Sequence, residues 1–229
     1  MNSTTLYFLI LASLGLSMLA QALTKSAYNR YSKTPASCGL TGGEVARRIL
    51  EKEGIQNVSI EAVNGTLTDH YDPSHLVLRL SSSTMYGTSV AAIGVAAHET
   101  GHVLQHRDAY KPLDIRNACV KTVGFGSRAA WPIFLVGLLL SFRPLIYLGI
   151  GLYAAIVAFS LITLPVEFNA SRRALDVLTA DGYLAGDETE GAQKVLSAAA
   201  LTYVASALTA ILQLLRLISI AQGNNRRRR

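Results

Sequence analysis

The hydrophobic positions of this chain gather in three long runs, separated by segments of mixed polarity. The runs cover residues 6–23, 129–166 and about 195–221. A helix needs about 20 apolar residues to cross a bilayer core of about 30 Å. The middle run is too long for one crossing, so we expect two spans that turn at Arg143-Pro144, because proline ends helices and arginine prefers the membrane interface.

The first run has two interpretations. Its tripeptide Ala-Gln-Ala at 20–22 resembles a cleavage site, which is typical of a secretory signal peptide. However, no Lys or Arg precedes the run, whereas Lys25, Arg30 and Lys33 follow it. Because positive residues favour the cytoplasmic side, the asymmetry favours an uncleaved anchor, with residue 25 onward in the cytoplasm.

Positive charges also bracket the predicted hairpin. Arg116, Lys121 and Arg128 precede it, and the pair 172–173 follows it. Both of its ends are therefore expected in the cytoplasm, in agreement with the anchor. If the last run also spans, the arginines at 226–229 end outside, against the positive-inside tendency, so its topology stays open.

The stretch 25–122 has the patterning of a small globular unit. Thr41 and Glu44 form a capping box, and the helix that they start is expected to end at Gly54. Strands are expected at 58–63, 66–70 and 75–80, with a two-residue hairpin turn at Asn64-Gly65. A second helix follows from about residue 89 to 106. Helix, small sheet and helix make a compact α+β unit.

Composition narrows the class of protein. The chain of 229 residues is 50% hydrophobic and only 16% charged, and its mean hydropathy is +0.31. Soluble domains carry about a quarter charged residues, so part of the chain is expected in lipid. Disorder is excluded, because the chain has too many apolar and too few charged residues for it. Cys38 and Cys119 are too few and too far apart for a disulfide scaffold. The net charge of +6 suits loops at an anionic membrane surface.

The segment HETGH at 98–102 carries the candidate chemistry. Histidines four residues apart project from one face of a helix, so both can bind the same zinc ion. Glu99 lies close enough to act as a general base on water activated by that ion. The flanking residues are uncharged, so the helix is expected to be buried, and a metal would offset the cost of burying these polar groups.

A third ligand must come from elsewhere in the chain. His106 lies about 12 Å along the helix from His98, which is too far for the same ion. Asp108 and Asp114 fall in an Arg- and Lys-rich surface stretch. Glu167 follows an apolar span. Two expected spans separate it from His102, so the chain crosses the membrane and returns, and both residues lie on the same side. A helix-start charge remains the alternative for this glutamate.

Five segments of the chain carry a family resemblance. They are LTGGEVARRIL at 40–50, GTLTDHYDP at 65–73, GVAAHETGHVLQ at 94–105, LPVEFNASRRAL at 164–175 and AALTYVASALTAILQLLR at 199–216. In these segments the chain strongly resembles the neutral zinc metallopeptidase family of small bacterial membrane proteins, the YugP-like group. The resemblance implies a membrane-anchored peptidase with one zinc ion per chain. It implies His98, His102 and Glu167 as zinc ligands and Glu99 as the catalytic acid and base.

More distantly, the chain is similar to the gluzincins, whose minimal fold has a backing helix, a small sheet, the HExxH helix and a glutamate helix. The expected fold is therefore an α+β gluzincin-like unit fused to a bundle of transmembrane helices. The expected parts are an anchor at 1–24, a cytoplasmic peptidase unit at 25–122, a transmembrane hairpin at 123–166, a glutamate helix and connection at 167–193, and a C-terminal apolar helix with a basic tail at 194–229.

Two details of the site depart from the family pattern or stay open. Related gluzincins often carry an acid four residues after the ligand glutamate, where it orients a zinc-bound histidine. Ser171 stands there in this chain, with Asn169 before it, so neutral groups would surround the ligands. His70 or Tyr71 is a candidate to stabilise the oxyanion, although a polar turn between strands is an equal interpretation of this segment.

The expected activity is hydrolysis of peptide bonds in protein or peptide substrates, including membrane proteins, at the cytoplasmic face of the cell membrane. The sheet edge at 75–80 would hold the substrate backbone as an added strand. The alternative is a non-catalytic multi-pass protein with a structural metal. An intramembrane protease is less favoured, because the apolar stretch before His98 has about nine residues rather than the roughly 20 that a span needs. Nucleic-acid binding is not expected, and the sequence gives no oligomeric state.

Overall fold

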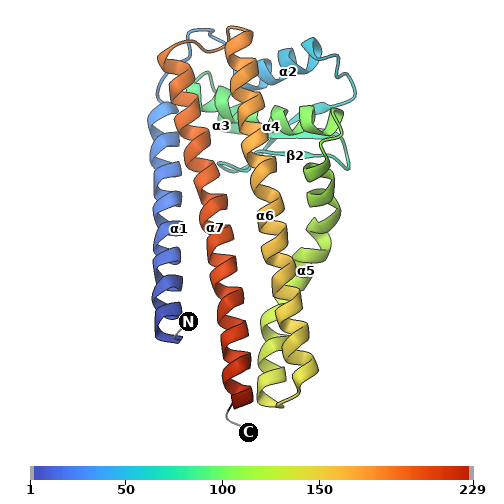
Figure 1. Ribbon diagram of the computed structural model, residues 1–229. Coiled ribbons are helices and arrows are strands. Elements are labelled where there is room, and N and C mark those ends of the chain that lie inside the picture. Colours follow the sequence, from blue (N-terminus) through green and yellow to red (C-terminus); the bar gives the residue numbers. More distant parts are fainter. Residues whose placement is uncertain (1–2, 227–229) are drawn as a thin grey trace. The chain divides into compact units, whose positions relative to one another are not determined.

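A computed structural model describes residues 3–226 of the chain and divides into two compact units (Figure 1). One unit contains Asp114–Pro165 together with the described residues up to Ala20 and from Thr202 onward. The other unit contains Gln21–Leu113 and Val166–Leu201. The expected fold class, an α+β unit joined to a bundle of apolar helices, is confirmed.

Among residues 3–226, four helices are long and apolar enough to cross a membrane. They are α1 (Ser3–Tyr31), α5 (Lys111–Leu139), α6 (Arg143–Ala180) and α7 (Asp187–Arg226). Each contributes residues to both units. The last run of the sequence thus forms a fourth candidate span, while the arginines at 227–229 lie outside the described residues.

The predicted hairpin between the two middle spans is present. The C-terminal end of α5 is closed by a bond from Phe142 N to the carbonyl of Gly137, with Ser141 in the left-handed region at φ 57°. A methyl group on Gly149 would lie 2.7 Å from Cβ of Phe134. Glycine at this position therefore allows the two helices to approach closely.

In the second unit, α2 (Gly42–Lys52) begins and ends as its sequence predicts. The Thr41 hydroxyl accepts a hydrogen bond from Glu44 N, and the Glu44 carboxylate accepts one from Thr41 N. At the other end, Gly54 has φ +70°, and Ile55 N donates to the carbonyl of Leu50. This arrangement is a Schellman motif, which needs glycine at the left-handed position.

The sheet corrects two predictions. Its strands are β1 (Ser59–Val63), β2 (His70–Asp72) and β3 (Val77–Ser81), in the order β1-β3-β2. Because β1 pairs with β3 in parallel, Asn64-Gly65 does not form a two-residue hairpin turn. Because β2 pairs with β3 on the other side, 77–81 is the central strand and not the expected edge. The central place suits β3, whose side chains are mostly buried.

The helix α4 (Val90–Arg107) lies between two hydrophobic clusters of the second unit, after the short helix α3 (Ser82–Met85). One cluster joins α4 to α2, α6 and α7 through residues such as Ile93, Ile49 and Leu178. The other joins α4 to the sheet, with Val103 near Leu78. Packing on both faces fixes α4 relative to its neighbours.

The position of Glu167 also differs from expectation. The sequence predicts that this residue begins a helix, because a proline precedes it in Leu164-Pro165-Val166. In the structure, α6 continues through Pro165 and reaches Ala180, so Glu167 lies inside one long helix. Its rotation about the helix axis is therefore set by a continuous backbone rather than by a helix start.

Candidate metal centre

The helix α4 carries three of the predicted site residues in a single turn. Ser89 caps its start, with a hydroxyl that accepts a hydrogen bond from Ala92 N at 3.2 Å. His98 and His102 project from the same face, and their rings meet edge to face with centroids 5.0 Å apart. His102 is buried, whereas His98 and Glu99 are partly buried.

Gly101 lets α6 approach this turn of α4. A methyl group at Gly101 would lie 2.6 Å from the backbone oxygen of Ala170, which is closer than atoms can pack. The absence of a side chain thus permits backbone contact one turn after Glu167. This contact brings the glutamate beside the two histidines.

The three predicted ligands converge. His98 Nε2 lies 3.4 Å from Glu167 Oε2, and His102 Nε2 lies 3.9 Å from Glu167 Oε1. All three ligand atoms lie within 4.8 Å of one another. Ligand atoms about 2.0–2.1 Å from a tetrahedral zinc are about 3.3–3.4 Å apart, so small adjustments would accommodate the ion. Two imidazoles and one carboxylate are also a donor set that zinc accepts, so the residues fit the metal.

Burial makes a cation at this place energetically reasonable. The side chain of Glu167 is only 4% exposed, and those of His102 and His98 are 9% and 16% exposed. A buried carboxylate is costly unless a positive charge or several hydrogen bonds compensate it. A divalent ion would supply that compensation.

The outer nitrogens of both histidines are held by neutral groups. His102 Nδ1 is 3.0 Å from Gln105 Oε1, and His98 Nδ1 is 3.1 Å from the Ser171 hydroxyl. Ser171 thus contacts a ligand histidine from the position where related gluzincins often carry an acid. Because the Nδ1 atoms bond outward, the Nε2 atoms face Glu167. Histidines that bind a metal through one ring nitrogen usually have the other nitrogen hydrogen-bonded in this way.

Glu99 has an environment that suits proton transfer. The pKa of its carboxyl is raised to about 7, mainly by burial. The negative charges of Glu167 and Asp69 also act to raise this pKa, whereas His98 and His70 act to lower it. A divalent cation beside this carboxyl would favour its ionised form.

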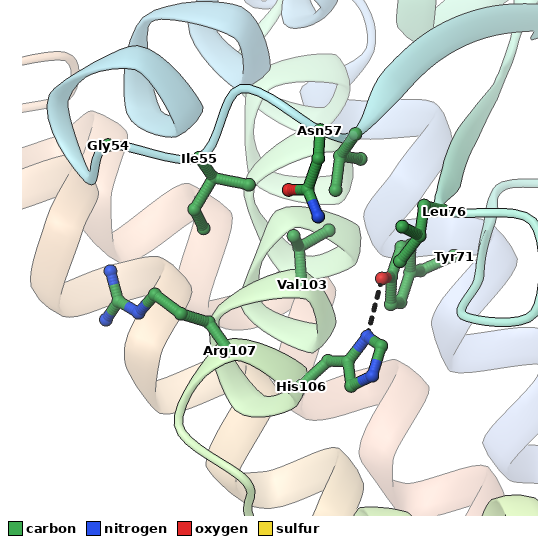
Figure 2. Close-up of a pocket in the computed structure, with 9 residues that line it drawn as sticks. Gly54, Ile55, Asn57, Tyr71, Leu76, Val103, His106 and Arg107 are labelled. Atoms are coloured by element: carbon green, nitrogen blue, oxygen red, sulfur yellow. Dashed lines mark hydrogen bonds between the residues drawn. The ribbon is translucent and has the colours of Figure 1, made fainter.

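Tyr71 and His106 form a pair one turn beyond the ligands. The Tyr71 hydroxyl lies 2.7 Å from His106 Nδ1, and burial raises the pKa of Tyr71 to about 12. Figure 2 shows both side chains at the wall of a cavity of about 300 Å³, which Val103 and Asn57 also line. Within residues 3–226, His106 is not part of the metal-ligand group.

The other candidates from the sequence lie in different surroundings. Asp108 accepts hydrogen bonds from Arg107 and Arg173, which lower the pKa of its carboxyl. His70 Nδ1 lies 2.9 Å from the backbone oxygen of Thr68. The oxyanion role suggested for His70 or Tyr71 stays a prediction, although the hydroxyl of Tyr71 already has a partner in His106.

Sequence reasoning missed Gln105. This residue is fully buried and contacts His102. The available signal is its place three residues after His102, because side chains three apart meet on a helix. His106 and Arg107, which follow it directly, instead suggest a polar helix end.

The packing at Gly101 predicts that Gly101→Ala damages the metal centre. The added methyl group must push α6 away, at a cost of about 1–3 kcal/mol in the free energy of unfolding, and it moves Glu167 away from the histidines. Zinc affinity and thermal unfolding would be measured on the full chain. Gly124→Ala is the matched control, because nothing lies within 4 Å of its added methyl group. Wild-type zinc affinity in Gly101→Ala would contradict the packing argument.

The environment of Glu99 predicts a pH dependence of stability in the metal-free protein. The pKa of its carboxyl is about 7 in the folded chain and near the ordinary glutamate value of 4.5 when the chain is unfolded. The folded state therefore loses stability as pH rises from about 4.5 to 7, and this loss persists above pH 7. Glu99→Gln removes the loss, on the order of 1–3 kcal/mol. Thermal unfolding in a chelator at pH 5 and pH 8 tests this: the variant should gain stability over wild type at pH 8. An equal difference at both pH values would refute it.

Comparisons with known proteins show the family of this chain. Residues 6–222 match the family model described as "Putative neutral zinc metallopeptidase". A relative in Bacillus subtilis (strain 168), called "Putative membrane protease YugP", is 52% identical over 213 residues, which cover 93% of this chain and 95% of the relative. No solved structure matches the chain. The matched length and the identity show that this chain belongs to the neutral zinc metallopeptidase family.

Proposed function

We propose that this protein is a membrane-anchored, zinc-dependent endopeptidase that holds one zinc ion per chain. The observation that carries the proposal is the convergence of His98, His102 and Glu167, with Glu99 next to the first ligand. The descriptions of the family and of the Bacillus subtilis relative support a zinc-dependent protease in a membrane.

The residues divide the chemistry between them. His98 and His102 would hold zinc through Nε2, and Glu167 would hold it through its carboxylate. When bound, zinc supplies Lewis-acid activation of water and of the scissile carbonyl. Glu99 takes a proton from the attacking water and passes it to the nitrogen of the leaving amine. Burial raises the pKa of this carboxyl and so favours the protonated form that delivers the proton, whereas a bound cation would favour the ionised form that accepts it.

The sheet offers an edge for an extended substrate. The strand β2 lies at an edge of the described sheet, with β3 on one side and no strand on the other, and it contacts α4. A peptide can add to such an edge through backbone hydrogen bonds. The substrate strand therefore belongs beside β2 rather than beside β3. His70 at the start of β2 is the better oxyanion candidate, because the Tyr71 hydroxyl is already bonded to His106.

The location of the proposed activity follows from the charges that flank the spans. Lys25, Arg30 and Lys33 follow the apolar run at 6–23, and Arg172 and Arg173 follow the apolar run at 129–166. On the positive-inside rule both places lie in the cytoplasm. We therefore propose a cytoplasmic active site that acts on membrane proteins or membrane-proximal peptides.

Replacing Glu99 by glutamine tests the activity. Glu99→Gln should keep its zinc, because the three ligands remain, and should lower kcat/KM for peptide cleavage by about 10²–10⁴-fold, because the general base is lost. Zinc content and cleavage of a quenched fluorescent peptide would be measured on purified full-length protein. Glu51→Gln, at an exposed position on α2, is the matched control.

Two outcomes contradict the proposal. Cleavage by Glu99→Gln at the wild-type rate would remove Glu99 from the reaction. Zinc binding without cleavage, by the wild type and the variant alike, would favour a structural metal in a non-catalytic membrane protein.

A further inference from the structure

Gln105 connects a candidate zinc ligand to the helix that carries another. Its side chain is fully buried, and its amide oxygen lies 3.0 Å from His102 Nδ1. Its amide nitrogen donates to the backbone oxygen of Val166 at 2.8 Å and to Asn169 Oδ1 at 2.9 Å. Val166 and Asn169 stand on either side of Glu167 in α6. One side chain therefore ties His102 to the backbone around the third ligand.

Arg173 determines which groups donate and which accept in this series of hydrogen bonds. Arg173 can only donate hydrogen bonds, and its Nε donates to Asn169 Oδ1 at 2.9 Å. Asp108 accepts a bond from the same guanidinium and holds it in place. Asn169 must therefore present its oxygen, not its NH₂ group, to Arg173 and to Gln105.

The orientation of the Gln105 amide follows from this constraint. Two acceptors, Asn169 Oδ1 and the Val166 carbonyl, face its nitrogen, so its NH₂ group must point to them. Its oxygen then faces His102 Nδ1 and can only accept. His102 Nδ1 must carry the proton, which leaves the lone pair on Nε2, the atom that faces Glu167.

His98 lacks such a constraint from its serine partner. The Ser171 hydroxyl can donate to His98 Nδ1 or accept from it, so this contact orients the ring without selecting its tautomer. The two ligand histidines are thus held in different ways, and the directional chain reaches His102 only through Gln105.

We propose that Gln105 is a positioning residue that sets both the ring orientation and the tautomer of His102 for metal binding, with Asn169 and Arg173 fixing the direction of its amide. This inference rests on the proposed zinc site. It gives the chain a neutral amide in the place where metal-bound histidines often have a carboxylate partner.

Gln105→Leu tests the proposal through metal affinity. The variant removes the acceptor for His102 Nδ1 at similar side-chain volume, and we expect zinc affinity to fall about 10–100-fold. The dissociation constant would be measured on the full chain by competition with a chelator at fixed pH, alongside thermal unfolding of the metal-free protein. Val103→Ala is the matched control: it removes buried contacts from the same helix but leaves the hydrogen-bond chain intact.

Two substitutions at Asn169 separate positioning from packing. Asn169→Asp keeps an acceptor for both Gln105 and Arg173, so its zinc affinity should stay within about 3-fold of wild type. Asn169→Leu removes that acceptor and should weaken zinc binding. The visible spectrum of cobalt-loaded protein gives a second readout: it should change for Gln105→Leu and stay as in wild type for Val103→Ala.

The outcomes are distinct. Wild-type zinc affinity in Gln105→Leu, or an equal loss in Val103→Ala of similar metal-free stability, would overturn the positioning role. A loss in Asn169→Asp as large as in Asn169→Leu would overturn the directional argument. None of these measurements needs cleavage, so an inactive but zinc-binding wild type would overturn the proposed function and leave the role of Gln105 standing.

Discussion

The carboxylate of Glu167 beside the Nε2 atoms of His98 and His102 is the interaction on which the rest of the site depends. It brings a negative charge into a largely closed environment, where only a cation or strong hydrogen bonds can compensate it. The three groups come from two helices that are far apart in the sequence. Gly101 permits the close contact between those helices, and the two hydrophobic clusters around α4 hold the helix in place.

The polar groups around the ligands are mostly neutral amides and hydroxyls. Gln105 and Ser171 hold the outer nitrogens of the histidines, while the charged pair of Arg173 and Asp108 lies farther along the hydrogen-bond chain. Burial and the charge of Glu167 both raise the pKa of the Glu99 carboxyl, which lies next to the candidate ligand His98.

Local signals in the sequence were sufficient for much of this picture. The capping box at Thr41, the helix end at Gly54 and the turn before Arg143 depend on neighbouring residues, and all three are present. The spacing of His98 and His102 places them on one face of a helix whatever the rest of the chain does. Glu167 was accessible through the family resemblance and through counting the spans that separate it from His102.

Non-local pairing was not accessible in the same way. The Asn64-Gly65 pair indicates a turn but does not determine which strand pairs with β1. The buried strand β3 takes the central position and pairs with β1 on one side and β2 on the other. The path of α6 through Pro165 depends on packing that outweighs the local tendency of proline to end a helix. The contact of Gln105 with Val166 and Asn169 spans more than sixty residues of sequence, so no local pattern predicts it.

The coordination of a single ion by residues 98, 102 and 167 is the central claim, and X-ray absorption at the zinc edge tests it most directly. For the zinc-loaded full chain, the account predicts two imidazole nitrogens and oxygen ligands at about 2.0–2.2 Å, with one imidazole lost in His102→Ala and an altered oxygen shell in Glu167→Ala. A sulfur ligand at about 2.3 Å, or a spectrum that neither substitution changes, would contradict it.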